Sequence, residues 1–435
     1  MNTYAKDLMK LMDASPVNFL AAGYVENELR DHGFTELKAE EAWPDMKAGD
    51  QYFVSKNNTA VFAFRVGRKH PAESGFKLIC AHSDSPGFRI KPKAEMKCEG
   101  GIVKLNTEVY GGPILYTWFD RPLSVAGRVI LRSGDPLHPA IRRICVGRPL
   151  LIIPHLAIHF NRAVNEGNPL SKQKDMLPVL GIISKELEAG DLLFNVIAQE
   201  LGCSKEDILD FDLSLYDTEK ATLVGLDEEF VSCGRLDDLA MVHAGLYALL
   251  NTETTDMTQV LAVFDNEETG SGTKQGAASP VLKNIMERIC HKTDAGSQKC
   301  DELFARAIER SFMISADMAH ALHPNYVEKQ DPTNHPVMGG GPVIKINAAQ
   351  KYVTDADSAA VFAEICRAAG VPVQYFVNHS DIAGGSTLGN ILTHQMPMRG
   401  VDMGNPMWAM HSVRETICAK DQEYVCRAFR QFFAI

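Results

Sequence analysis

Short apolar runs of strand length recur along the chain, and amphipathic helical patterns lie between some of them. The clearest helical pattern covers residues 235–250, where leucine and valine side chains repeat on one face. Continuous apolar runs are typical of strands that helices cover on both faces. The pattern therefore predicts an α/β fold with a mixed sheet sandwiched by helices, whose strands include residues 77–82, 259–265, 311–317, 341–347 and 371–377.

A further helix is predicted near the start of the chain. Ser15 followed by Pro16 is typical of an N-cap with proline at the first helical position, and Gly33 is placed to end the helix. Apolar residues repeat at helical spacing between them.

The stretch from Lys93 to Leu226 has a different pattern. Segments such as "GIVKLNTEVYGG", "PLSVAGRVILRS" and "ATLVGLDEEF" alternate apolar and polar positions and turn at glycines, as short antiparallel strands do. We therefore predict a β-rich second domain, residues 93–226, inserted between two parts of the α/β domain, residues 1–92 and 227–435.

Composition and charge exclude some partners. The chain has 435 residues and a formal net charge of -11, which argues against nucleic acid because phosphate binding needs a basic face. The start "MNTYAKDLMKLMDAS" lacks the features of a secretory signal, and the most apolar stretch, residues 149–160, is too short and too polar to span a membrane. Ten scattered cysteines without a Cys-x-x-Cys pair favour reduced thiols and a cytoplasmic location.

Side chains with metal-binding chemistry stand where several predicted strands end. In open α/β sheets, ligands gather at the carboxyl ends of the strands, so we expect five separate segments to meet at one edge. The candidate side chains are His82 and Asp84, Glu267 and Glu268, Asp317 and His320, Asp237 at the start of a helix, and His411 after a glycine- and methionine-rich turn.

Two histidines and several carboxylates suit zinc, manganese or cobalt in a hydrolytic site. A pair of such ions needs a shared carboxylate. One ion would then take His82 and Asp317, the other Glu268 and His411, and Asp237 would bridge both. The adjacent glutamates make sense in this arrangement, because one binds metal while its neighbour stays free as a general base.

Each motif has a simpler interpretation when it is taken alone. "HSDSP" can be a solvated loop, and "NEET" an exposed turn or a helix start, where the helix dipole favours glutamate. The stretch "GSGTKQG" after a strand loosely resembles a dinucleotide fingerprint and would suggest an NAD-linked oxidoreductase, but its glycine spacing differs. A third interpretation is an inactive scaffold that kept the fold. Such a protein would be expected to have lost metal ligands, yet all the candidate ligands named above are present. The metal hypothesis depends on the occurrence of all these motifs together in one chain.

Seven stretches, in order from residue 81 to residue 415, resemble the M18 aspartyl aminopeptidases, a branch of the co-catalytic zinc peptidases. The family often has asparagine where this chain has Asp238, and we expect Asp238 to lie beside the site rather than to bind metal. The matching stretches are "AHSDSPGFRIKP", "GRLDDLA", "FDNEETGSGT", "SADMAHALHPNY", "GPVIKINAAQKY", "DIAGGSTLGNI" and "RGVDMGNPMWAMHSVRE".

The resemblance implies a zinc-peptidase-like fold and two zinc ions per subunit, for which manganese or cobalt can substitute. Glu267 would be the general base, in agreement with the interpretation from the residues. Asp84, two residues after His82 on an extended strand, is placed to hydrogen-bond the other nitrogen of that imidazole. One ion would bind His82, Asp237 and Asp317, and the other would bind Asp237, Glu268 and His411.

The resemblance also implies the substrate: peptides with aspartate or glutamate at the N-terminus. Lys345 lies on a predicted strand, where a buried lysine is costly without a partner, although it could also reach the surface from an edge strand. The resemblance assigns Lys345 to the substrate carboxylate, with Tyr352 and His320 as further groups of the pocket.

Two histidines of the predicted inserted domain, His155 and His159, are four residues apart, a spacing that also suits simple packing. In the M18 family a histidine in this part of the chain reaches the active site of a neighbouring subunit, and the chains assemble into a tetrahedral dodecamer. The resemblance therefore implies a homo-oligomer built through residues 93–226. His159 would contact the substrate of the neighbouring subunit, with His155 as the alternative.

Overall fold

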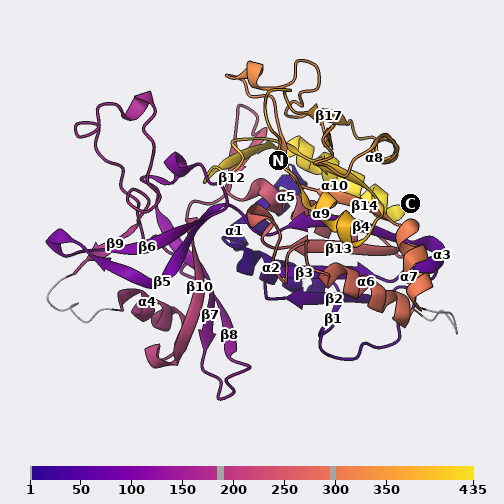
Figure 1. The fold of residues 1–435 in the computed structure, drawn as a ribbon, viewed down its shortest axis with the longest axis horizontal. Coiled ribbons are helices and arrows are strands. Elements are labelled where there is room, and N and C mark those ends of the chain that lie inside the picture. Colours follow the sequence, from indigo (N-terminus) through magenta and orange to yellow (C-terminus); the bar gives the residue numbers. More distant parts are fainter. Residues whose placement is uncertain (1, 184–190, 294–299) are drawn as a thin grey trace.

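The computed structural model describes residues 2–183, 191–293 and 300–435. Its largest sheet is mixed, and its central strands β13, β4, β14 and β18 run parallel (Figure 1). Every residue of β4, β13 and β14 is buried, as the continuous apolar runs predicted. In spatial order the strands are β1 (Thr35–Glu36), β2 (Gln51–Lys56), β3 (Ala60–Arg65), β13 (Thr258–Phe264), β4 (Phe76–His82), β14 (Phe312–Ala316), β18 (Arg399–Gly404), β16 (Val343–Ile346) and β17 (Gln374–Val377).

Two apolar cores lie on opposite faces of this sheet, because successive side chains of a strand point to opposite faces. In β13, for example, Leu261 packs in the first core and Val260 in the second. The first core is covered by α1 (Thr3–Ala14), α2 (Asn18–Asp31), α5 (Leu236–Leu250), α8 (Ala356–Ala368) and α10 (Ala419–Ala434). The second is covered by α6 (Val281–Lys292), α7 (Cys300–Glu309) and α9 (Leu388–Gln395), and the single turn α3 (Pro71–Ser74) precedes β4.

The predicted start of α2 is wrong by a few residues. The helix begins at Asn18 after an extended Val17, and no side chain caps it. Ser15 instead ends α1, since its N–H bonds to the carbonyl of Met12. The predicted end is confirmed, because Gly33 follows the helix with a φ of 85°.

A second sheet is antiparallel throughout and lies to one side of the first (Figure 1). It has its own apolar core, to which helix α4 (Leu192–Leu201) contributes Leu193 and Ile197. Its strands, in spatial order, are β8 (Ala140–Cys145), β7 (Leu123–Leu131), β10 (Ile208–Asp217), β5 (Gly87–Lys97), β6 (Ile102–Tyr110) and β9 (Val179–Ile182). The α/β fold with a β-rich addition is thus confirmed, while the boundaries at 93 and 226 stay a prediction.

A third sheet joins segments that are far apart in the sequence. The stretch "ATLVGLDEEF" contributes to this sheet rather than to the second one. The strands are β11 (Thr222–Val224), β12 (Phe230–Cys233), β20 (Glu415–Cys418), β19 (Pro406–Trp408) and β15 (Ala319–His320). The short 3-10 helices within the described ranges are η1 (Glu99–Gly101), η2 (Leu115–Trp118), η3 (Val164–Glu166), η5 (Lys205–Asp207), η6 (Glu267–Thr269) and η7 (Val327–Lys329). Among the described residues, no helix is long and apolar enough to cross a membrane.

Candidate metal centre

The candidate ligands meet at the carboxyl edge of the central strands. His82 is the last residue of β4, Asp317 follows β14 directly, and η6 follows β13. Asp237 lies in the first turn of α5, and His411 lies between β19 and β20. The structure brings these side chains together in two groups that share Asp237: His82, Asp237 and Asp317, and Asp237, Glu268 and His411, with the ligand atoms of each group within 4.8 Å of one another.

Asp237 lies between the two histidines. Its Oδ1 is 3.4 Å from Nε2 of His82, and its Oδ2 is 3.5 Å from Nε2 of His411, which is also 3.4 Å from Oε1 of Glu268. A backbone carbonyl lies 3.1 Å from Nδ1 of each imidazole, that of Asp84 for His82 and that of Gly112 for His411. Because a carbonyl only accepts hydrogen bonds, both Nδ1 atoms donate, and both Nε2 atoms are left to bind metal.

Two buried oxygens of this cluster fit a bound cation. Oδ1 of Asp237 and Oε1 of Glu268 have no hydrogen-bond partner within the described part of the chain. Buried polar atoms are normally paired, so these oxygens are available as ligands. Imidazole and carboxylate donors in this number suit zinc. A third possible grouping, of His82, Glu267 and Glu268, shares residues with both.

The electrostatics of the cluster show an excess of negative charge. Burial raises the pKa of Glu267 to about 8, and the carboxylates of Asp317 and Asp237 add to this rise. Burial and then Asp237 raise the pKa of Glu268 to about 10. For Asp237 burial acts in the same direction, but the neighbouring imidazoles of His411 and His82 hold its pKa below the usual range. Divalent cations would counteract the raised pKa values of Glu267 and Glu268, because a nearby cation favours the charged form of a carboxylate.

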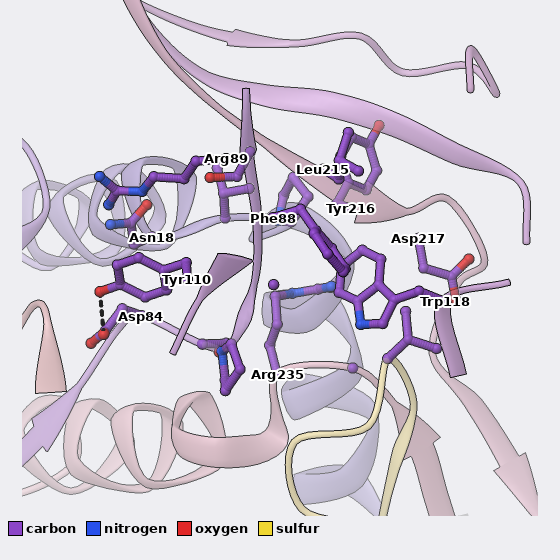
Figure 2. A pocket seen from close by; sticks show the side chains of 18 of the residues that line it. Asn18, Asp84, Phe88, Arg89, Tyr110, Trp118, Leu215, Tyr216, Asp217 and Arg235 are labelled. Carbon is purple, nitrogen blue, oxygen red and sulfur yellow. Dashed lines mark hydrogen bonds between the residues drawn. The ribbon is translucent and has the colours of Figure 1, made fainter. Parts of the chain in front are cut away.

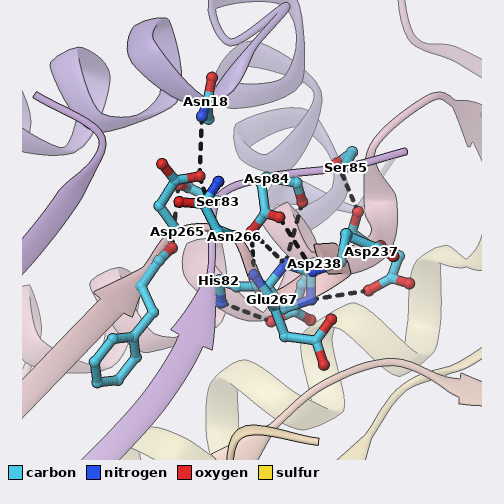
Figure 3. A network of polar contacts seen from close by, with 12 residues as sticks. Asn18, His82, Ser83, Asp84, Ser85, Asp237, Asp238, Asp265, Asn266 and Glu267 are labelled. Atoms are coloured by element: carbon cyan, nitrogen blue, oxygen red, sulfur yellow. Dashed lines mark hydrogen bonds and ion pairs between the residues drawn. The ribbon is translucent and has the colours of Figure 1, made fainter. Parts of the chain in front are cut away.

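The sequence analysis predicted that Asp84 contacts the imidazole of His82, and in the structure Asp84 contacts further groups as well. Its Oδ1 is 3.4 Å from Nδ1 of His82, farther than its own carbonyl oxygen. The carboxylate accepts a hydrogen bond from the backbone N–H of Glu267 at 3.1 Å (Figure 3). It also accepts one from the backbone N–H of Glu268 at 3.2 Å. Asp84 therefore holds the loop that carries both glutamates.

Asp238 lies beside the ligands, where its Oδ2 accepts the backbone N–H of His82 at 3.1 Å. Glu415, which the sequence analysis missed, has a comparable position. Its buried carboxylate accepts the N–H of Asp237 at 3.1 Å and the N–H of His411 at 2.7 Å. It lies inside a stretch that resembles the family, but no strand-end pattern distinguishes it.

A cavity of about 430 Å³ opens onto the two groups. His320, Lys345 and Tyr352 line it together with Glu267. Lys345 is 3% exposed in β16, which lies between β18 and β17, so the alternative of a lysine reaching the surface from an edge strand is wrong. Its Nζ is 3.3 Å from Oδ1 of Asp317, donates to the carbonyl of Met318 at 3.0 Å and lies 5.5 Å from the ring centroid of Tyr352.

His155 and His159 lie apart from this site. His159 is exposed, and His155 packs edge-on against Phe119 at 4.5 Å between ring centroids. Neither belongs to the groups of potential ligands or lines the cavity in the described part of this chain.

The dinucleotide interpretation does not match the local structure. A pyrophosphate fingerprint opens a helix, whereas the glycine stretch 270–276 forms turns and the next helix, α6, begins only at Val281. The two glutamates before it face the metal groups instead.

Imidazole and carboxylate donors in two groups that share an aspartate are typical of a metal-dependent hydrolase. The family model described as "Aminopeptidase I zinc metalloprotease (M18)" matches residues 11–433, and the chain belongs to this family. It is 50% identical over 430 residues to "Probable M18 family aminopeptidase 2" of Clostridium acetobutylicum, covering 99% of this chain and 98% of that protein.

Solved structures agree with this assignment. Ape4, in a complex with Nbr1 studied by cryo-electron microscopy, superposes with a TM-score of 0.94 at 36% identity and covers 99% of this chain and 85% of that one. The mApe1 dodecamer of S. cerevisiae gives a TM-score of 0.85 at 25% identity, over 99% and 96% of the two chains. The protein is therefore a hydrolase of the zinc metalloaminopeptidase family.

Proposed function

We propose that this protein is a dinuclear zinc aminopeptidase that removes N-terminal aspartate and glutamate from peptides. The observation that carries the proposal is the position of Asp237, which presents one carboxylate oxygen to each of two histidines. A shared carboxylate is what two metal ions about 4 Å apart require. His82 and Asp317 complete one proposed ion site, and Glu268 and His411 complete the other.

Glu267 is the proposed general base. It lines the cavity and is not needed as a ligand in either of the two groups that share Asp237. When bound, two zinc ions would supply Lewis-acid chemistry, acidifying a water molecule and polarising the scissile carbonyl. Glu267 would accept the proton of the attacking water and return it to the leaving amine.

The experiment that tests this function compares metal-stripped and zinc-reloaded protein on peptides that differ only in the N-terminal residue. We expect hydrolysis only after reloading, fastest for aspartate and glutamate. The Glu267→Gln variant should bind zinc normally and turn over at least about a hundredfold more slowly. Hydrolysis that survives the removal of metal would contradict the metal mechanism, and equal rates on all N-termini would contradict the specificity.

Lys345 is the proposed determinant of acidic specificity, because it is the one lysine or arginine among the described residues that line the cavity. Its ammonium group also compensates Asp317, so its loss could act on all substrates alike. We expect Lys345→Ala to reduce kcat/KM for peptides with N-terminal aspartate by about 10- to 100-fold, since a hydrogen bond to a charged group contributes about 1.5–3 kcal/mol. The same measurement on peptides with N-terminal alanine is the control, and equal losses would reject this role.

We further propose a homo-oligomer, a tetrahedral dodecamer, with His159 reaching the active site of a neighbouring subunit. The similarity to the mApe1 dodecamer supports assembly. The chain near His159 also exposes apolar side chains that a partner could cover: Leu156 is 57% exposed and Phe160 80%. A variant made monomeric should retain zinc and lose activity, and a fully active monomer would exclude this arrangement. A cytoplasmic location is proposed from the scattered cysteines.

A further inference from the structure

Residues 110–112, which are the last residue of β6 in the second sheet and the two glycines after it, contact the metal centre at three separate residues. Tyr110 donates its hydroxyl hydrogen to Oδ2 of Asp84 at 2.6 Å (Figure 2). A methyl group on Gly111 would lie 3.2 Å from Cβ of Glu268. The carbonyl of Gly112 lies 3.1 Å from Nδ1 of His411. The 110–112 segment thus connects the second sheet to side chains from both halves of the α/β part.

The direction of the hydrogen bond between Tyr110 and Asp84 is fixed by a third residue. Nδ2 of Asn266 donates to the Tyr110 oxygen at 2.8 Å, so the single hydroxyl hydrogen is available for Asp84. Asp84 is 2% exposed, and the same carboxylate accepts the N–H groups of Glu267 and Glu268. Tyr110 therefore holds, through one carboxylate, the backbone of both glutamates, and it bonds directly to the residue before them.

The other end of the segment acts on His411. The Gly112 carbonyl fixes the proton on Nδ1, so that Nε2 faces Asp237 and Glu268 at 3.5 and 3.4 Å. The segment is itself held, because the N–H of Ile114 donates to the carbonyl of His411 at 2.9 Å. Partners of this kind orient metal-binding side chains, and their loss typically costs 10–100-fold in metal affinity or activity.

We propose that the 110–112 segment is part of the active-site framework and that Tyr110 is a positioning residue for the loop of Glu267 and Glu268. The second sheet then has a function in the reaction within its own subunit, in addition to any function in assembly. This inference rests on the proposed role of Glu267 as the base.

Tyr110→Phe removes only the hydroxyl group. The ring remains for the guanidinium of Arg89, which lies 4.6 Å from its centroid. Tyr216→Phe is a matched control in the same sheet, because the Tyr216 hydroxyl donates to the carbonyl of Val146 at 2.7 Å and contacts none of the residues assigned to the metal centre. Both variants are compared with the unaltered protein at temperatures where circular dichroism shows all three to be folded.

We expect Tyr110→Phe to lower kcat by about 10–100-fold with KM within about twofold, and to weaken zinc binding by about tenfold. Amide exchange at Glu267 and Glu268, measured in the metal-free protein, should become faster, whereas Tyr216→Phe should leave all three quantities unchanged. Unchanged kcat and amide exchange in Tyr110→Phe, or equal losses in both variants, would overturn the proposal.

Two further measurements keep the inference separate from the proposed function. Gly111→Ala places a methyl group against Glu268 and should lower zinc affinity even if Tyr110→Phe is too unstable to assay. The exchange measurement does not depend on catalysis, so full activity of Glu267→Gln would refute the proposed base and leave the positioning of the loop testable.

Discussion

At the scale of single residues, Asp237 joins the two groups of potential metal ligands, because it belongs to both. It is 3% exposed, and each of its carboxylate oxygens faces a different histidine. A buried carboxylate without compensating charge costs several kcal/mol, so the arrangement is stable only with cationic partners. Two side chains hold its backbone: Glu415 accepts the N–H of Asp237, and the Ser85 hydroxyl donates to its carbonyl at 2.9 Å.

The adjacent aspartates allow a matched test of this bridging role. Asp237→Asn keeps the size of the side chain and removes the charge that both ions would share, so we expect less than one zinc per subunit and at least about a hundredfold loss of kcat. Asp238→Asn makes the same change at the next residue and retains an amide oxygen for the N–H of His82. Elemental analysis and kinetics on both variants check this expectation, and two tightly bound zinc ions in Asp237→Asn would refute it.

At the scale of elements, the packing of strands sets the position of the ligands. The parallel pairing of β4 with β13 and with β14 brings His82, η6 and Asp317 to the same edge of the sheet. β18 pairs with β14 on the other side, and Gly404 at its end comes close to Asp317: a Cβ atom at Gly404 would lie 1.9 Å from the Asp317 carbonyl oxygen. Because this contact involves backbone, a rotamer change cannot relieve it.

Gly404→Ala is therefore expected to push β14 and β18 apart and to displace Asp317. The free energy of unfolding should fall by about 2 kcal/mol or more, as for other overpacked cores, and zinc affinity should fall with it. Gly147→Ala is the control, since a Cβ atom there meets nothing within 4 Å. Urea denaturation and zinc titration of both variants measure the effect, and equal stability of the two would show that the strands accommodate the methyl group.

At the scale of the whole molecule, the C-terminal helix α10 bonds to two strands of the central sheet. Lys77 of β4 donates to the carbonyl of Phe433 near the end of α10, and Gln259 of β13 donates to the same oxygen. Lys77 is 3% exposed, and burial lowers its pKa to about 8. The packing of α10 against the sheet therefore buries the ammonium group of Lys77, where its charge is unfavourable.

This burial predicts a dependence of stability on pH. Between the lowered pKa of about 8 and the ordinary lysine pKa of 10.5, the unfolded chain binds a proton on Lys77 that the folded protein lacks, so stability increases with pH in this window. Below it the full cost of charging the buried amine is present. Lys77→Met should thus raise the free energy of unfolding at pH 7 by about 2 kcal/mol, from the pKa shift less one lost hydrogen bond.

Urea denaturation of metal-free wild-type protein and the Lys77→Met variant at several pH values measures this effect. The difference between the two should shrink as the pH rises towards 10. A difference that does not change with pH would show that charging the Lys77 amine does not lower the free energy of unfolding.

Sequence patterns sufficed for the buried strands β4, β13 and β14 and for α5, because continuous apolar runs and a helical repeat require no knowledge of distant partners. The buried strands β3 and β18 were not among the predictions. They also placed the metal-binding side chains at strand ends, where polar residues interrupt an apolar run. The start of α2 was mispredicted because the backbone of Ser15 already ends α1, a competition that local preferences do not resolve.

By itself, then, the sequence determined the fold class, the strands with continuous apolar runs and the chemical types available at their ends. Only the tertiary structure decided which atoms meet. Asp237 and Glu415 are 178 positions apart, and Tyr110 and Asn266 are 156 apart. Hydrogen bonds between such distant positions have no periodic signal in the chain, because their geometry exists only after the sheets have packed.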